Sequence, residues 1–290
     1  MKEKVKKIAR VFPRKTAATP DDDLVFFGSP PRLTLPEIDE VHVSVTFTYD
    51  RKKAEELAYD REAVGVPVKI GGPAYDDPAD GDFIPGRYLK KGYVITSRGC
   101  NNQCWFCSAW RREGKLRELP ITEGWNVLDN NLLQCSEDHI RSVFEMLKRQ
   151  KEKPVFTGGI EAKQLRPWHC DLLRDVKAKR IYFAYDTPDD YEPLVVAGKA
   201  LREAGISPQS HTLACYVLIG FKGDTFDAAQ KRLEQTIQAG FMPYAMLYRD
   251  VSGIVDKEWA KFQSEWLKPV IVGSKFGKVW HRECGDKGRG

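Results

Sequence analysis

Long apolar runs are missing from this 290-residue sequence, because none approaches the roughly 20 residues that a membrane-spanning helix needs. The first seven residues, Met1 to Lys7, are mostly charged and contain no apolar core of the kind found in secretory leaders. The sequence is also not of low complexity. Apolar residues make up 42% of the chain and charged residues 30%, which excludes a disordered or collagen-like protein. We therefore expect a folded cytoplasmic protein with no membrane partner.

Cysteine is absent before residue 100 and then appears as a cluster. Cys100, Cys104 and Cys107 lie within eight residues, while the other four of the seven cysteines are scattered singly. An odd total without a second close pair argues against a disulfide framework and against a zinc site closed by two pairs. Closely spaced thiolates suit an iron–sulfur cluster. Three ligands leave one iron of a four-iron cluster open to a substrate or cofactor.

Acidic residues are scarce at the two ends of the sequence. Lys and Arg number 46 against 41 Asp and Glu, a net charge of +5, yet residues 1–15 hold seven basic residues and one acidic, and residues 268–290 hold six and two. The chain between these ends is net acidic. Basic ends are able to contact phosphates, which makes nucleic acid a candidate partner, and solvated tails explain them equally well.

The cysteine cluster has the pattern Cys100-x3-Cys104-x-Phe106-Cys107 and follows an apolar run at residues 92–99. This pattern resembles the signature of radical S-adenosylmethionine (SAM) enzymes, closest to the methylthiotransferase and cobalamin-type branches. The resemblance implies a [4Fe-4S] cluster on the three cysteines, SAM as the second cofactor with Phe106 beside it, and a partial (β/α)6 barrel. A flavodoxin- or ferredoxin-like protein would donate the electron that cleaves SAM to a 5′-deoxyadenosyl radical.

The chain after the cysteines alternates between strand and helix patterns, as such a barrel requires. Apolar runs predict strands at 92–99, 125–129, 153–159, 180–186, 211–219 and 242–248. Helical patterns begin at Ser136 and span 168–177, 191–203 and 226–238. We predict an α/β fold with the barrel at residues 90–250, a small N-terminal α/β region at 1–89, and a C-terminal helix and basic tail at 251–290.

Polar residues and glycines follow several of these strands, at the end where parallel barrels hold their chemistry. The resemblance assigns SAM contacts to six residues: the amino group to Asp129, Asn130 and Asn131, the ribose to Asp186, and the adenine to the backbone of Ile219 and Gly220. The family often has Gly-Gly-Glu after the second strand, so the departure to Asp-Asn-Asn leaves open which residue makes the amino contact.

Structural alternatives accompany these assignments. Asp186 is equally a candidate helix N-cap, and the segment 220–225 a turn followed by a cap. Residues 158–161, Gly-Gly-Ile-Glu, form a tight turn, a SAM contact or a substrate contact. Cys135 is either a hydrogen-atom donor to a product radical or a buried inert thiol.

Residues 41–72 have the strand–helix–strand pattern of a doubly wound domain fragment, and residues 68–73 resemble the late part of a cobalamin-binding domain. The Asp-x-His-x-x-Gly loop of such domains is missing, and the region is short. We therefore expect a truncated Rossmann-like region that does not bind cobalamin.

Together these features predict a radical SAM enzyme that removes hydrogen from a nucleotide or nucleic-acid base. The alternatives are a radical SAM enzyme acting on a peptide or small metabolite, and a non-catalytic iron–sulfur module that binds nucleic acid. Aromatic residues interleaved with basic ones at 257–282 suit nucleic-acid binding, and they suit equally a helix at 256–267 that closes the barrel.

Overall fold

The computed structural model describes residues 6–28, 38–62, 65–76, 82–207, 211–250, 252–267 and 272–274. The chain forms two compact units. The first contains Met1–Tyr93, Gly99–Leu116 and Val251–Gly253, and the second contains Val94–Arg98, Arg117–Asp250 and Ile254–Gly290. The change of unit at Tyr93 lies near the predicted boundary at residue 90, but the cysteine loop groups with the first unit.

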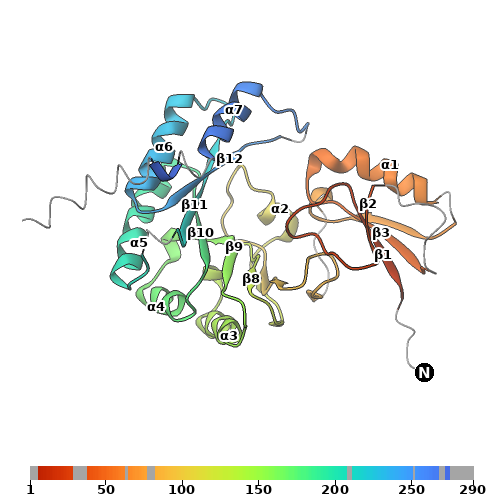
Figure 1. Ribbon diagram of the computed structural model, residues 1–290, viewed down its shortest axis with the longest axis horizontal. Helices are drawn as coiled ribbons and strands as arrows, with labels where there is room; N and C mark the ends of the chain where they lie inside the picture. Colours follow the sequence, from red (N-terminus) through yellow and green to blue (C-terminus); the bar gives the residue numbers. More distant parts are fainter. Residues whose placement is uncertain are drawn as a thin grey trace, which may run out of the picture. The chain divides into compact units, whose positions relative to one another are not determined.

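The first unit is built on a parallel sheet with the strand order β2-β1-β3-β4. Its strands are β1 (Ile8–Phe12), β2 (Val25–Phe27), β3 (Glu40–Ser44) and β4 (Val68–Gly71). Helix α1 (Arg51–Glu62) joins β3 to β4 and lies along one face of the sheet (Figure 1). Ala54 and Leu57 of α1 pack with the valines of β1 and β3 in a small core.

This sheet is larger than the strand–helix–strand fragment predicted at residues 41–72. The prediction identified β3, α1 and β4 but missed β1 and β2. With three residues in β2 and five in β1, the strands are too short for a clear period-two pattern. The order 2-1-3-4 matches the first four strands of the flavodoxin-like doubly wound sheet.

The second unit is built on a sheet with the order β12-β11-β10-β9-β8-β5, so strands that follow one another along the chain lie side by side. The strands are β5 (Tyr93–Val94), β8 (Asn126–Val127), β9 (Val155–Ile160), β10 (Arg180–Tyr185), β11 (Leu213–Ile219) and β12 (Met242–Leu247). All pairings from β8 to β12 are parallel. The α/β class with parallel sheets is therefore confirmed.

Helices connect the longer strands and lie on one side of this sheet (Figure 1). They are α3 (Glu137–Lys148), α4 (Pro167–Asp175), α5 (Tyr191–Glu203) and α6 (Phe226–Gln238). Their apolar faces and the sheet bury large side chains, among them Phe144, Phe156, Phe183 and Phe241. Burial of this apolar surface is the main stabilisation of the unit.

Helix ends follow local sequence signals. The predicted N-cap Ser136 accepts a hydrogen bond from His139 N (3.3 Å), and α5 and α6 have their predicted bounds. Asp256 caps α7 (Lys257–Trp266), close to the predicted helix at 256–267. The shorter helices are α2 (Ala109–Glu113), η1 (Thr48–Asp50), η2 (Pro73–Tyr75), η3 (Leu132–Gln134), η4 (Ala162–Gln164) and η5 (Pro188–Asp190). Within the described ranges, no helix is long and apolar enough to cross a membrane.

The prediction of a single strand at 92–99 is wrong. The run forms β5 and then β6 (Ser97–Arg98), which pairs antiparallel with β7 (Arg117–Glu118). Ile95 and Thr96 separate the two strands, and the backbone N–H of Thr96 donates to the Asp129 carboxylate (2.6 Å) instead of to a neighbouring strand. A side-chain acceptor therefore interrupts the sheet at this point.

Candidate functional site

The three clustered cysteines lie on one loop of the first unit, residues 99–116. All three are half-buried, and none of them forms a disulfide. Cys107 N donates to Cys104 O (3.2 Å) in a tight turn, and Cys100 N donates to Gly114 O (3.2 Å) at the base of the loop. The loop therefore presents three sulfur donors from a backbone that is hydrogen-bonded to itself.

Further contacts fix the shape of this loop. Trp110 Nε1 donates to Cys104 O (3.0 Å), and the backbone N–H of Ala109 points to Cys107 Sγ (3.4 Å). Gly99 has a φ of +83°, and a Cβ there would collide with the carbonyl oxygen of Lys115, so the start of the loop requires glycine.

Phe106, the predicted neighbour of SAM, is half-buried on the same loop. Its ring meets the Trp105 ring edge-on, with centroids 5.4 Å apart. Trp105 is 51% exposed, and Arg111 Nη2 donates to its carbonyl oxygen (3.3 Å). The cysteine loop thus combines soft sulfur donors with an aromatic surface.

The donor set of the loop fits a thiolate-bound cluster, because three uncrosslinked cysteines lie on one short segment. Across the described ranges, no three His, Cys, Asp or Glu side chains converge as a ready-made metal site. We therefore expect the cysteine side chains to close around the metal as it binds. Cys284 lies outside the described residues.

In the second unit, Asp129 follows β8 and is 1% exposed. Its carboxylate accepts hydrogen bonds from Thr96 N (2.6 Å), Thr96 Oγ1 (2.5 Å) and Ser97 Oγ (2.8 Å). Burial raises the pKa of Asp129, and these hydrogen bonds oppose the rise. The carboxylate therefore links the end of β8 to the segment that follows β5, which is a structural role.

The other two polar residues after β8 have different surroundings. Asn130 is half-buried, whereas Asn131 is buried and donates through Nδ2 to Glu161 Oε2 (2.6 Å). Gln134 Nε2 donates to the same oxygen of Glu161 (3.2 Å). Because Glu161 directly follows β9, the carboxyl ends of β8 and β9 share one polar group.

Residues 158–161 play two roles. Gly158 belongs to β9, and a Cβ there would collide with the carbonyl oxygen of Asp129, so close approach of the two strand ends requires glycine. Gly159 has a φ of +96°. Glu161 supplies the acceptor for Asn131. The structure thus gives the glycines a packing role and leaves the carboxylate at the edge of the sheet.

Asp186 follows β10 and is half-buried. Burial raises the pKa of its carboxyl group to about 7, and the nearby Asp190 carboxylate adds to the rise, while the backbone N–H of Leu218 donates to the group and opposes it. The alternative of Asp186 as a helix N-cap is wrong, because Thr187 caps η5. Asp186 is thus a carboxyl group at a strand end that titrates near neutral pH.

Ile219 is buried at the end of β11, and Gly220 follows with a φ of +71°. A Cβ on Gly220 would approach Leu247 Cδ1 to 2.5 Å and Trp259 Cδ2 to 3.1 Å. Strand β12 and helix α7 therefore occupy the space beside this glycine. A contact from Ile219 or Gly220 to a ligand would have to come from the backbone.

A buried ion pair holds the turn after β11. Asp224, with a side chain 1% exposed, accepts hydrogen bonds from Gly220 N (2.8 Å) and Arg232 Nη2 (2.7 Å). Arg232 Nη2 also donates to Leu218 O (3.0 Å). Thr225 caps α6 by accepting from Ala228 N (3.2 Å), which confirms the predicted cap.

Cys135 is buried in the second unit, where its thiol hydrogen-bonds with Ser97. Burial raises the pKa of this thiol to about 12, so the sulfur keeps its proton at neutral pH. A protonated thiol is compatible with both alternatives for Cys135, a hydrogen-atom donor and an inert core thiol. Burial also raises the thiol pKa of Cys170, to about 11, and of Cys215.

Sequence reasoning missed the partners of these carboxylates. Thr96 and Ser97 were assigned to a strand, and Arg232 was assigned only to a helix. One available signal was position: the Thr-Ser pair follows β5 and Asp129 follows β8, and these two strands are neighbours in the sheet. The pairing of Arg232 with Asp224 has no comparable signal in the sequence.

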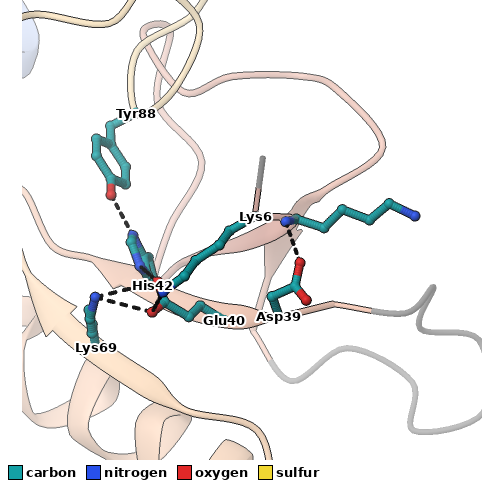
Figure 2. Close-up of polar contacts among 7 residues, drawn as sticks. Lys6, Asp39, Glu40, His42, Lys69 and Tyr88 are labelled. Atoms are coloured by element: carbon teal, nitrogen blue, oxygen red, sulfur yellow. Dashed lines mark hydrogen bonds and ion pairs between the residues drawn. The ribbon is translucent and has the colours of Figure 1, made fainter. Parts of the chain in front are cut away.

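A second polar cluster lies in the first unit, as Figure 2 shows. Glu40 accepts from Lys6 Nζ (2.9 Å), Lys69 Nζ (3.3 Å) and His42 Nε2 (3.1 Å), and these bonds, led by that from Lys6, lower the pKa of Glu40 to about 2. His42 Nδ1 bonds with the Tyr88 hydroxyl, and burial lowers the pKa of His42. The carboxylate is neutralised inside the cluster, so we interpret the cluster as structural.

Basic residues also line an open pocket of about 570 Å³ in the first unit. They are Lys6, Lys7, Arg10, Arg87 and Lys91, opposed by Asp21 and Asp22. Arg10 is buried, pairs with Asp22 and donates to the backbone oxygens of residues 86 and 87. Most of the basic ends, residues 1–5 and 275–290, lie outside the described residues.

In comparisons with known proteins, no family model and no curated protein matches this sequence. The function therefore has to be inferred from the residues themselves.

Proposed function

We propose that the chain is a radical SAM enzyme that acts on a nucleotide or nucleic-acid base. Cys100, Cys104 and Cys107 would hold a [4Fe-4S] cluster, and the carboxyl edge of the six-stranded sheet would hold SAM. When bound, the cluster would pass one electron to SAM, which cleaves to methionine and a 5′-deoxyadenosyl radical able to remove hydrogen from the substrate.

The observation that carries this proposal is the placement of three half-buried cysteines, none of them in a disulfide, on a short loop in a parallel α/β chain. The chain leaves the second unit after Arg98 and re-enters it at Arg117, two residues that pair in the β6–β7 ladder. The loop therefore follows the first strand of a sheet whose strands lie in chain order. Three thiolates leave one iron available to a ligand.

The residues at the carboxyl edge suit a cationic ligand. SAM carries a sulfonium and an ammonium group, and an ammonium requires oxygen acceptors. Asn130 after β8 and Glu161 after β9 offer such oxygens. Asp129 would act by positioning this edge, since its carboxylate already accepts three hydrogen bonds from Thr96 and Ser97.

Asp186 would accept the ribose hydroxyls, and the backbone of Ile219 and Gly220 would flank the adenine. Because the Asp186 carboxyl has a pKa of about 7, its ability to accept two hydroxyl donors increases as the pH rises through neutrality. Cys135 would reduce a product radical only if a hydrogen atom can pass from its protonated thiol. A flavodoxin- or ferredoxin-like protein would supply the electron.

The test is anaerobic reconstitution of the full chain with iron and sulfide, followed by reduction with SAM and measurement of 5′-deoxyadenosine. We expect the wild type to form it, and Cys104→Ala to lose both the cluster absorbance and the product while keeping its circular dichroism. Cys170→Ala, which removes a buried thiol outside the cluster loop, is the matched control and should retain both.

A cluster that forms but leaves SAM intact under a strong reductant would refute the enzyme and favour the non-catalytic iron–sulfur module. Product formation by Cys104→Ala at the wild-type rate would refute the cysteine assignment. If 5′-deoxyadenosine forms, candidate nucleotides, peptides and metabolites can be ranked by how far each raises its rate.

A further inference from the structure

The face of the six-stranded sheet that points away from helices α3 to α6 has an unusual composition. In β10, Ile181, Phe183 and Tyr185 are buried on the helix side, and Tyr185 Oη donates to Gln235 of α6 (2.8 Å). Side chains alternate along a strand, so Tyr182 and Ala184 face the other way. This second face is not closed by a hydrophobic layer, because Ala184 is exposed.

Three tyrosines from neighbouring strands meet on this face: Tyr182 of β10, Tyr216 of β11 and Tyr244 of β12, which we call the tyrosine platform. The rings of Tyr182 and Tyr216 stack with centroids 4.5 Å apart and planes 4° from parallel. Tyr244 stands edge-on to both, at 6.2 Å and 6.1 Å. Tyr216 and Tyr244 are also direct register partners, so strand pairing fixes the arrangement.

The platform is rigid but remains accessible. Tyr216 Oη donates to Thr157 O of β9 (3.3 Å), which anchors its ring, while Tyr244 is 41% exposed. Met246, two residues further along β12, is 42% exposed. An exposed apolar patch on a sheet face costs free energy in water and is typical of a binding surface. Tyr244 and Met246 therefore offer an exposed aromatic and apolar contact area.

The chemistry of the platform selects its ligand. Burial raises the pKa of the Tyr182 and Tyr216 phenols, so these two groups are uncharged at neutral pH. The Arg180 guanidinium stands over the Tyr182 ring at 6.0 Å and supplies the positive charge beside the platform. Aromatic rings next to a cation suit a ligand with a planar ring and a nearby anionic group.

We infer that the tyrosine platform binds a nucleobase of the substrate, with Arg180 beside its phosphate. This inference rests on the proposed function and names the substrate class of the same site. Asp186 directly follows β10, so the strand that carries Tyr182 ends at the carboxyl edge where SAM is proposed to bind. A nucleic acid also matches the basic ends of the chain.

The test measures binding by the full chain without cluster, SAM or reductant. Fluorescence anisotropy would compare a labelled single-stranded uridine hexamer with an abasic ribose-phosphate hexamer of the same charge. We expect the wild type to bind the uridine hexamer more tightly, and Tyr244→Ala to weaken that binding about fivefold or more with the abasic hexamer unaffected, since stacking on an aromatic side chain is lost.

Two controls accompany this variant. Tyr244→Phe keeps the ring and should bind as the wild type does, and Tyr59→Ala removes a 75%-exposed tyrosine from α1 and should change nothing. Thermal unfolding of Tyr244→Ala checks that the sheet is intact. Equal binding of the two hexamers, or no effect of Tyr244→Ala, would overturn the inference. Tighter, Tyr244-dependent binding of a tryptophan-containing hexapeptide would replace the nucleobase with a peptide.

This experiment separates the inference from the proposed function. Base-dependent binding together with absent SAM cleavage would keep the platform and refute the enzyme. SAM cleavage without base-dependent binding would keep the enzyme and refute the platform.

Discussion

The sheets of the two units treat their carboxylates differently. In the first unit, Glu40 bonds with the ammonium groups of Lys6 and Lys69, whose side chains are 62% and 64% exposed. In the second unit, Asp129 and Asp224 are almost fully buried, and backbone N–H groups are among their donors. A carboxylate that bonds with exposed lysine side chains restrains the backbone little. A buried carboxylate that accepts from backbone N–H groups fixes the position of that backbone. The second unit therefore fixes the ends of its strands more firmly, which the proposed SAM site would require.

The largest expected effect is that of Asp224→Ala, which tests this contrast directly. The substitution leaves the buried Arg232 guanidinium and Gly220 N without their acceptor, and breaking a buried pair costs about 3–5 kcal/mol of unfolding free energy. Guanidinium unfolding followed by circular dichroism measures it. Asp227→Ala, an exposed residue three positions along, is the control and should cost under about 1 kcal/mol. If Asp224→Ala loses no more unfolding free energy than Asp227→Ala, the contrast between the two units is refuted.

An intermediate effect is expected from Asp186→Asn, and its pH dependence sharpens the contrast. The folded-state pKa of about 7 exceeds the ordinary 3.8, so the folded protein keeps a proton that the unfolded chain releases. Wild-type stability should therefore fall as the pH rises from 3.8 to about 7, and the asparagine variant should escape this loss. We expect the variant to gain up to about 4 kcal/mol at pH 8, since each pKa unit is worth about 1.4 kcal/mol, and nothing at pH 3.

Unfolding free energies of both proteins across this pH range provide the measurement. A gain that does not change with pH would show that Asp186 does not titrate near neutrality. Asp189→Asn, an exposed neighbour in η5, should give a flat difference.

The smallest effect is expected from Glu40→Gln in the first unit. The folded-state pKa of Glu40 is about 2 against an ordinary 4.5, so its contribution is complete above pH 4.5 and is lost as the pH falls toward 2. Wild type and variant should therefore differ at pH 6 and converge at pH 2 in acid unfolding. Glu56→Gln on α1 should match the wild type throughout. A difference that persists at pH 2 would contradict the shared-carboxylate interpretation.

Much of the second unit could be predicted from the sequence, because its signals are local. The caps Ser136 and Thr225 and the helix bounds at 191–203 and 226–238 depend on residues a few positions apart. The first unit was predicted less completely, because β1 and β2 gain their hydrogen bonds only from strands distant in the sequence.

The candidate site divides in the same way. Cys100, Cys104 and Cys107 could be identified by spacing alone, and their role as cluster ligands stays a prediction. The strand-end positions of Asp129, Asp186 and Gly220 could be predicted as well. The role of each residue could not be predicted. The Asp129 carboxylate accepts hydrogen bonds from Thr96 and Ser97, and Trp259 fills the space beside Gly220.

By itself the sequence determined the cysteine triplet, the alternation of strands and helices, and the polar residues after each strand, because these depend on spacing and local hydrogen bonds. Only the tertiary structure decided which carboxylates are buried and paired, that Glu161 joins Asn131, and that tyrosines from three strands meet on one face. Those outcomes depend on strand register and burial, which bring together residues far apart in the chain.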